Sequence, residues 1–379
     1  MRSPISRRWL MIASSLCALS LVVAACGGSS SSSSSSSSGS SSSSSTSSAK
    51  ADKVAVLLPD TKSSVRWETA DRPLLQQAFQ SAGVPVEIQN AQGDKSTQQQ
   101  QAEQAITNGA KVLLLVNLDS GSGAAIEANA KSQGVKVIDY DRLTLGGSAD
   151  YYVSFDNVAV GKLQGQGLVD CLQKGGGPAK PKIAELNGSP TDNNATLFAQ
   201  GYNSVLNPLY KAGKAVKVAD QSVPDWDNQK ALTIFEQMLQ KESNKIDGVL
   251  AANDGLGNAA ISAIKARKLS QIPVTGQDAT AEGIQNILAG DQCMTVYKAI
   301  KQEADAASKL AIALSKKQSP AAGLVNGQSN DTKRQVPSVL LKPQAITKDN
   351  VNVVFDDGFL KKSDVCTGKY AQLCTAAGV

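Results

Sequence analysis

The stretch VAVLLPDTKSSVRWETADRPLLQQAFQSAGVPVEIQN, residues 54–90, contains the pattern that decides the fold. Its first six residues form a continuous apolar run, which is typical of a strand. Residues 72–83 have helical spacing and end at Gly83, and residues 84–90 have the composition of a second strand. A strand, a helix and another strand in succession predict two parallel strands joined by a crossover.

The same alternation continues along the chain. Further strands are predicted at 111–118, 135–141, 151–157, 182–188, 216–223, 247–254, 272–278 and 294–298. Helices are predicted at 96–110, 123–134, 192–211, 228–243, 256–267, 280–289 and 299–316. Two such series in a chain of 379 residues predict an α/β protein with two lobes, each built on a doubly wound parallel sheet.

The N-terminus has the organisation of an export signal. A basic segment, MRSPISRR, precedes the apolar run WLMIASSLCALSLVV, and small residues lead to Cys26. This pattern predicts a lipoprotein signal peptide at 1–25 with a lipid on Cys26, followed by a serine-rich flexible tether at 26–49. The alternative is an uncleaved membrane anchor, for which the apolar run is short against the roughly 20 residues of a span.

Charge and composition exclude several classes of protein. The chain has 38 Lys and Arg against 33 Asp and Glu, and three of these cations, Arg2, Arg7 and Arg8, lie in the signal. The remainder is 35 against 33, a net charge of +2, which does not indicate a nucleic-acid partner. The chain contains no histidine, which excludes histidine bases and histidine metal ligands. We expect neither a metal nor a cofactor.

The cysteines beyond the signal and Cys26 are four in number: Cys171, Cys293, Cys366 and Cys374. An even number in an exported chain favours disulfides, and four cysteines allow three pairings. The short segment between Cys366 and Cys374 makes that pair the easiest to close, which would leave Cys171 with Cys293.

Polar and aromatic side chains follow the predicted strands. In doubly wound sheets ligands bind beyond the carboxyl ends of the strands, so these positions are candidates for a binding site. The first such loop, residues 60–73, lacks the glycines of a phosphate-binding loop and offers Arg66 and Trp67 instead. The later positions are Asp119, Asp141, Arg142, Asp156, Asn157, Asp192, Asn193, Asn194, Trp226, Asn253, Asp254, Gln277, Asp278 and Lys298.

This set of residue types suits a neutral polyhydroxy ring. Each hydroxyl both donates and accepts, so it pairs with Asp as acceptor, with Arg or Lys as donor and with Asn as either. The apolar faces of such a ring suit flat indoles. The alternative is helix capping by Asp119, Asp156, Asp192 and Asp254. The neighbours Asp141 and Arg142 could also form a surface pair of little energetic value.

Seven motifs carry a family resemblance. Within residues 53–361, they resemble in order the D-xylose-binding proteins of bacterial sugar ABC transporters, which have the type I periplasmic-binding-protein fold. The motifs are SVRW, VIDYDRL, YYVSFDNVAVGKLQ, NGSPTDNNATLFAQG, AAND, TGQDA and MTVYKAI. The resemblance implies sugar contacts by Arg66, Asp141, Arg142, Asn194, Asn253, Asp278 and Lys298, and stacking by Trp67 and Trp226. The flanks of Trp226, SVPDWDNQ, differ from the family pattern, which leaves the identity of the sugar open.

The resemblance also implies an architecture and partners. We expect one lobe at 50–156 and 298–328, a second at 157–297 and 329–361, and an additional tail at 362–379. Chain crossings near 156, 298 and 326–336 would form a hinge whose closure buries the sugar. The partners implied are a monosaccharide, D-xylose or D-glucose, and an ABC permease with its ATPase. We expect a monomer held at the outer face of the membrane by its lipid.

Three other functions remain to be compared. A lipid-anchored glycosidase could use Asp141 and Asp278 as its carboxylate pair, although no other catalytic motif supports an enzyme. A sugar-responsive transcription regulator is disfavoured by the export signal and by the lack of an N-terminal helix-turn-helix. A sensory binding protein that serves a receptor rather than a permease is not distinguished by the sequence.

Overall fold

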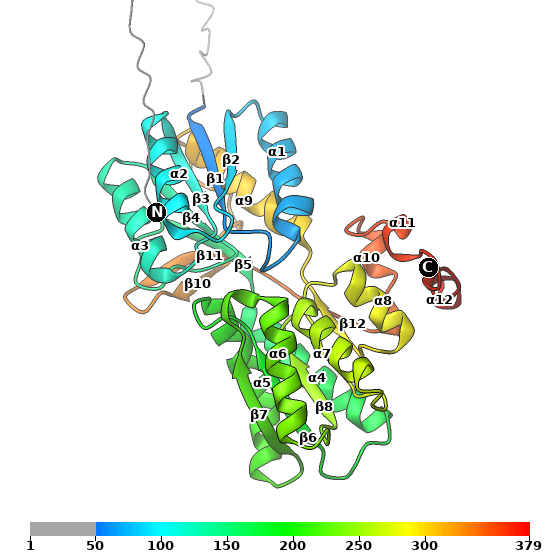
Figure 1. Cartoon of the computed structure of the whole chain (residues 1–379). Coiled ribbons are helices and arrows are strands. Elements are labelled where there is room, and N and C mark those ends of the chain that lie inside the picture. The colour runs from blue at the N-terminus through cyan, green and yellow to red at the C-terminus, as the bar shows by residue number, and fades with distance from the viewer. Residues whose placement is uncertain (1–50) are drawn as a thin grey trace, which may run out of the picture. The chain divides into compact units, whose positions relative to one another are not determined.

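The computed structural model describes residues 51–379 (Figure 1). The predicted signal peptide, Cys26 and the serine-rich tether therefore lie outside the described residues. Within 51–379, none of the helices has both the length and the apolar character needed to span a membrane.

The first lobe is built on a seven-stranded sheet with the order β10-β11-β5-β4-β3-β1-β2. All neighbours in it are parallel except the β10–β11 hairpin. The strands are β1 Lys53–Leu58, β2 Val86–Asn90, β3 Ala110–Leu115, β4 Lys136–Tyr140, β5 Tyr151–Phe155, β10 Gly327–Asn330 and β11 Gln335–Leu341.

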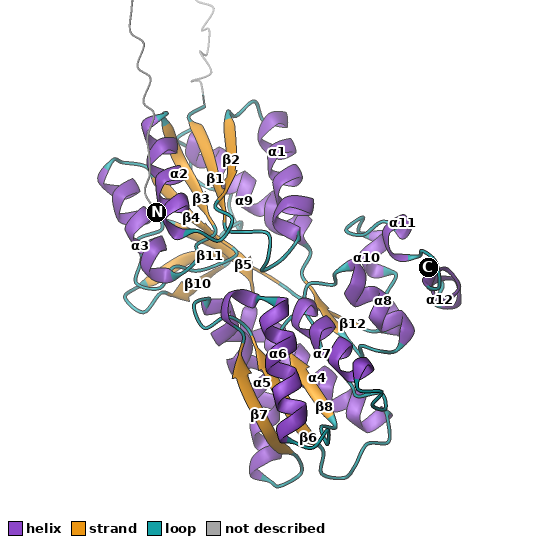
Figure 2. Cartoon of the chain, viewed as in Figure 1, coloured by secondary structure: helices purple, strands orange, loops and turns teal. Residues whose placement is uncertain are grey.

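Helices cover both faces of this sheet (Figure 2). They are α1 Arg72–Ser81, α2 Lys95–Thr107, α3 Ser120–Ser132 and α9 Ile300–Ser315. Alternate residues of β1 point to opposite faces: Val54 and Val56 pack with α1 and α9, whereas Ala55 and Leu57 pack with α2 and α3. The apolar run at 54–58 is therefore buried on both sides.

The second lobe contains a parallel sheet of β7-β6-β8 and a two-stranded antiparallel sheet of β9 and β12. Its strands are β6 Lys182–Asn187, β7 Val216–Ser222, β8 Gly248–Ala251, β9 Thr295–Tyr297 and β12 Gln344–Ile346. Its helices are α4 Asn157–Lys174, α5 Asn193–Lys211, α6 Asn228–Lys241, α7 Asp254–Ala266 and α8 Ala281–Ala289. The strand predicted at 272–278 is reduced to one bridge between Val249 and Val274.

Three segments cross between the lobes. They lie between β5 and α4, between β9 and α9, and between β11 and β12. The first and third are joined by a hydrogen bond from the N–H of Asp156 to the C=O of Leu341, 2.9 Å long. The predicted boundary at 329 is wrong, because β11 pairs with β5 and keeps the chain in the first lobe as far as Leu341. The α/β class with parallel sheets is confirmed.

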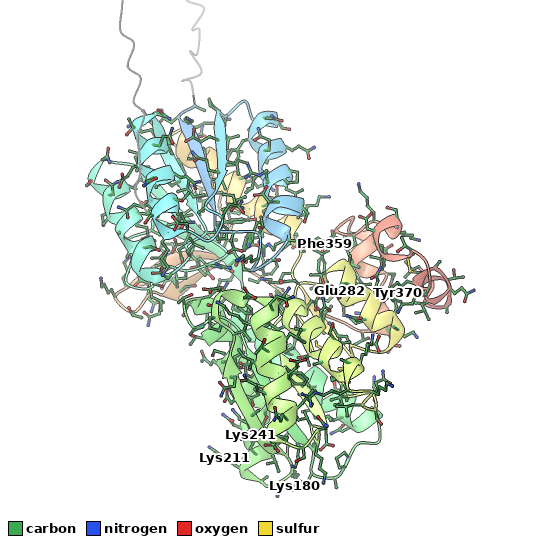
Figure 3. The ribbon with its side chains drawn as sticks, in the orientation of Figure 1. Lys180, Lys211, Lys241, Glu282, Phe359 and Tyr370 are labelled. Carbon is green, nitrogen blue, oxygen red and sulfur yellow. A yellow bond between two sulfur atoms is a disulfide. The ribbon has the colours of Figure 1, made fainter. Side chains whose placement is uncertain are left out.

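The C-terminal segment packs on α8. It contains α10 Val353–Asp356, α11 Lys362–Val365 and α12 Tyr370–Ala376, and Gln285 donates from its Nε2 to the C=O of Val365. Figure 3 shows Phe359 and Tyr370 near Glu282 of α8, whereas Lys180, Lys211 and Lys241 lie at the end of the second lobe remote from the crossings.

Both favoured disulfides are present in the structure. The Cα atoms of Cys366 and Cys374 are 5.8 Å apart and those of Cys171 and Cys293 are 6.2 Å apart, which is within the usual range. The first closes the C-terminal segment on itself. The second ties α4 to the residues that lead into β9.

Candidate functional site

The structure brings all nine predicted contact residues to one cavity. This cavity has about 320 Å³ of space between atoms, part of which is open to solvent. The nine predicted residues that line it are Arg66, Trp67, Asp141, Arg142, Asn194, Trp226, Asn253, Asp278 and Lys298. Eight of the nine are buried, and the side chain of Asp278 is 11% exposed. The lining is completed by Ser63, Ser64, Asp192, Phe198 and Gln277, of which only Asp192 and Gln277 stood out as residues that follow strands.

The topology explains this convergence. Asp141 and Arg142 follow β4 in the first lobe. In the second lobe, Asn194 lies in the first turn of α5, after β6, and Asn253 follows β8. Because the strands of each lobe are parallel, their carboxyl ends meet at one edge of each sheet. The cavity lies where these two edges face each other.

The guanidinium of Arg66 is held by three carboxylates. Its Nε and Nη2 donate to both oxygens of Asp71, at 2.8 and 2.9 Å, and Nη2 also donates to Glu303 at 2.6 Å. Its Nη1 donates to Asp141 at 3.0 Å. Of the five N–H groups, one on Nη1 lacks a partner among the described residues. Arg66 therefore positions the acids around it and has one donor left for a ligand.

Neither Asp71 nor Glu303 was predicted. Asp71 lies only five residues after Arg66, so the spacing of two opposite charges was a local signal. Glu303 lies in the first turn of α9, 237 residues away, and only the folded topology brings it to Arg66. Burial raises the pKa of Glu303 to about 8, against the opposing effect of Arg66.

Asp141 is the acceptor at the centre of the cavity. One carboxylate oxygen accepts from Arg66, and the other accepts from Asn194 Nδ2 at 3.1 Å, which joins the two lobes. Burial acts to raise the pKa of Asp141, but the positive charges of Lys298, Arg66 and Arg142 outweigh it and hold the pKa below its usual range. Asp141 is thus fixed in its charged, accepting form.

Lys298 lies on a segment that crosses between the lobes. It follows β9 and precedes α9, and its Nζ is 3.5 Å from Asp141 and 3.6 Å from Asp278. Burial acts to lower the pKa of Lys298, but Asp141 and Asp278 raise it above its usual value. A permanent cation therefore bridges an acid of each lobe at the hinge itself.

The two tryptophans are held differently. Trp67 donates from Nε1 to Ser63 Oγ at 3.1 Å, and the guanidinium of Arg66 lies 4.3 Å from the centre of its ring. Trp226 donates from Nε1 to Asp192 at 3.1 Å. A Cβ at Gly188 would lie 2.0 Å from Trp226 Cη2, so the absence of a side chain there makes room for the indole.

Several site residues have a backbone conformation that is rare outside glycine. The φ angles are 62° at Asp141, 56° at Trp226 and 101° at Asp278, and Asp225 and Ala279 are also positive. Such conformations cost on the order of 1–3 kcal/mol each and gather at binding and catalytic sites. These residues lie in the turns after β4, before α6 and before α8, where the backbone accepts this cost and thereby sets the direction of the side chains.

An ion pair between lobes closes one side of the cavity. Arg142 Nε lies 3.1 Å from Asp192 Oδ2, and Arg142 also donates to Ser63 at 3.0 Å. Arg142 and Asp192 also line a second and larger cavity, the outer cavity, together with Lys62 and Lys230. The pair therefore stands between the inner cavity and the outer one.

The capping alternatives hold for some of the strand-end acids. Asp119, Asp156 and Asp192 accept from the N–H groups of Ser122, Ala159 and Asn194, so each caps a helix. For Asp192 this role adds to its place in the cavity. Asp254 is not a cap, because Asn253 caps α7 and the Asp254 carboxylate accepts from Thr280, Gln292 and Thr295 instead.

The cavity is electrically balanced. Its lining carries three cations, Arg66, Arg142 and Lys298, and three carboxylates, Asp141, Asp192 and Asp278. Such a lining, together with two indoles, provides many directed donors and acceptors without an excess of either charge. Among residues 51–379, no three His, Cys, Asp or Glu side chains are placed to hold a metal ion.

Comparison with known proteins gives consistent matches. Residues 54–319 match the periplasmic binding protein domain family. The chain is 38% identical over 319 residues to a D-xylose-binding periplasmic protein of Escherichia coli, with 84% of this chain and 93% of that protein covered. It is 34% identical over 330 residues to the multiple sugar-binding periplasmic receptor ChvE of Rhizobium radiobacter, with 83% and 92% covered.

Solved structures agree. A carbohydrate transporter solute-binding protein of Chloroflexus aurantiacus, in complex with D-glucose, superposes with a TM-score of 0.75 at 32% identity, with 82% of this chain and 97% of that chain covered. An ABC transporter solute-binding protein of Clostridium phytofermentans with bound β-D-glucose gives a TM-score of 0.77 at 29% identity, with 83% and 99% covered. These matches confirm the resemblance found in the sequence, and the chain belongs to the periplasmic binding protein family.

Proposed function

We propose that this protein captures a monosaccharide between its two lobes and delivers it to an ABC permease. The observation that carries the proposal is the convergence of all nine predicted contact residues on one balanced cavity between the lobes. A neutral polyhydroxy ring uses such directed donors and acceptors, whereas a phosphate or a free amino acid calls for an excess of charge at one point. Each charge-assisted hydrogen bond contributes about 1.5–3 kcal/mol.

The ligand we propose first is D-xylose, and the second is D-glucose. Support for xylose comes from the name of the E. coli relative, and support for glucose comes from the sugars bound in the two solved neighbours. The two sugars have the same ring stereochemistry and differ by one exocyclic CH₂OH. The same set of Asp, Asn and Arg side chains can therefore serve both, and the space beside C5 decides between them.

A lipid on Cys26 would hold the protein at the outer face of the membrane, with the serine-rich segment as its tether. Replacement of Cys26 by Ser should release the protein from the membrane fraction into the medium. Retention of the Cys26→Ser protein in the membrane fraction would contradict the proposed anchor.

A catalytic role is less well supported than binding. A glycosidase requires one of its two carboxyl groups to be protonated as the general acid. The pKa of Asp141 is held below its usual range by three cations, so this group does not serve as the acid near neutral pH. The acid would have to be Asp278, whose carboxylate is already paired with Lys298 at 3.6 Å. Delivery to a sensory receptor remains the second candidate partner, and growth on the sugar after deletion of the gene distinguishes transport from sensing.

Calorimetric titration against D-xylose, D-glucose, an amino acid and a sugar phosphate tests the proposed ligand class. We expect one pyranose to bind per chain. Binding of the amino acid or the phosphate, without binding of a pentose or hexose, would overturn the proposal.

A further inference from the structure

Gln277 is a buried residue whose side-chain carbonyl oxygen has no hydrogen-bond partner among the described residues. The residue is 3% exposed and lines the inner cavity, between Gly276 and Asp278. Its Oε1 is inaccessible to solvent and accepts no hydrogen bond from the described residues. Its Nε2 also donates to none of them, but it is absent from the buried unpartnered atoms and so is accessible to solvent.

The other glutamines with a buried, unpartnered Oε1 provide a contrast. In each of these, Nε2 donates to a protein oxygen, so half of the amide is satisfied. They are Gln98, Gln101, Gln164 and Gln292. Among residues 51–379, Gln277 is the member of this group that makes no side-chain hydrogen bond at all.

The backbone fixes Gln277 in place. Its C=O accepts from the N–H of Asp254, and the next N–H, of Asp278, donates to the C=O of Val296, both at 2.9 Å. The following φ angle of 101° at Asp278 sets the course of the turn. A buried polar group without a partner costs free energy, so such a group in a fixed position indicates a partner from outside the chain.

We propose that Gln277 binds the ligand directly, as a further specificity-determining residue of the sugar site. This inference rests on the proposed monosaccharide function. A planar amide can accept from one hydroxyl through Oε1 and donate to the neighbouring hydroxyl through Nε2. Two adjacent hydroxyls of a pyranose offer this combination, so Gln277 selects ligands with a free vicinal pair and rejects those in which one hydroxyl is missing.

The test compares Gln277→Met with the wild type. Methionine keeps the length and the unbranched shape of the side chain and removes both polar groups. We expect the affinity for D-xylose, measured by calorimetry, to fall at least about tenfold. In the absence of sugar we expect the melting temperature to stay unchanged or to rise, because the variant removes an unsatisfied group.

Gln98→Met is the matched control. Gln98 is equally buried, but its Nε2 donates to the C=O of Val116 at 2.8 Å, and it does not line the inner cavity. This variant should melt at a lower temperature and keep the affinity of the wild type. The two glutamines thus separate a structural amide from one that serves the ligand.

Monodeoxy analogues of D-xylose identify the contact. For the analogue that lacks a hydroxyl bound by Gln277, the wild type and Gln277→Met should differ clearly less in affinity than they do for D-xylose. An equal loss for every analogue would overturn the inference, because it would indicate a distorted cavity. Equal affinities of wild type and variant for D-xylose would also overturn it. If the wild type binds no monosaccharide, the proposed function fails and the inference fails with it.

Discussion

Replacement of Arg66 by Met distinguishes a structural guanidinium from one that mainly serves the ligand. The change leaves Asp71, Asp141 and Glu303 without their shared cation, all within a region where the side chains are at most 5% exposed. Asp141 keeps Lys298 at 3.5 Å and Asp71 keeps the hydroxyl of Tyr140, but Glu303 loses the one side-chain donor that it has within residues 51–379. Breaking a buried ion pair by removing one partner costs about 3–5 kcal/mol.

We therefore expect Arg66→Met to lower the free energy of unfolding by about 3–5 kcal/mol without any sugar present. The loss should be greater at pH 9 than at pH 6, because Glu303, with its pKa of about 8 in the wild type, is mostly neutral at the lower pH. Urea denaturation at both pH values measures the effect.

Arg72→Met is the control for this measurement. The ion pair of Arg72 with Glu68 is about one-third exposed on both sides, and Arg72 also donates to the C=O of Ile88 at 2.7 Å, so their loss should together cost about 1–2 kcal/mol. If Arg66→Met is as stable as the wild type and loses only its affinity for sugar, the guanidinium serves the ligand and the structural role described above is refuted.

Three further predictions concern binding and pH. Trp226→Ala and Trp67→Ala should each weaken sugar binding at least about tenfold, or about 1.4 kcal/mol, whereas Asp52→Ala, outside the cavity, should not; equal calorimetric affinities would contradict the proposed stacking. Asp192→Asn removes the charge opposite Arg142 and should speed sugar release in stopped-flow experiments about tenfold; an unchanged rate would show that this pair does not hold the cavity closed. Because the pKa of Glu303 is raised to about 8 in the folded protein, its contribution to stability is complete below pH 4.5 and is lost as the pH rises to about 8. The free energy of unfolding of the wild type should therefore fall over that range, and that of Glu303→Gln should fall less. Parallel curves of the unfolding free energy against pH would contradict this role of Glu303.

The sequence predicted the positions of the site residues better than their roles. Alternation of strands and helices located the carboxyl ends of the strands, and the family resemblance selected nine residues there, which do line one cavity. Five other strand-end residues do not line it: Asp119, Asp156, Asn157, Asn193 and Asp254. The role of Arg66 was predicted incompletely, because its three carboxylates come from different segments of the chain. Glu303 in particular is brought to it by α9, which packs on the first sheet after the chain has passed through the second lobe.

Other differences have equally local causes. The hairpin of β10 and β11 was not predicted, because Gly327–Asn330 has no apolar run, and the third crossing was therefore placed too early in the chain. The turns with positive φ at Asp141, Trp226 and Asp278 contain no glycine at those positions, and composition gives no sign of them. Asp254 resembles a helix cap in sequence, but the preceding Asn253 takes that place and leaves Asp254 to organise the turn at Thr280.

A crystal structure of the protein with D-xylose tests the central claim most directly. We predict one pyranose in the inner cavity, within hydrogen-bonding distance of Asp141, Asn194 and Lys298, with a ring face against Trp226. A sugar bound only in the outer cavity beside Lys62 and Lys230, or on the surface, would contradict the site described above.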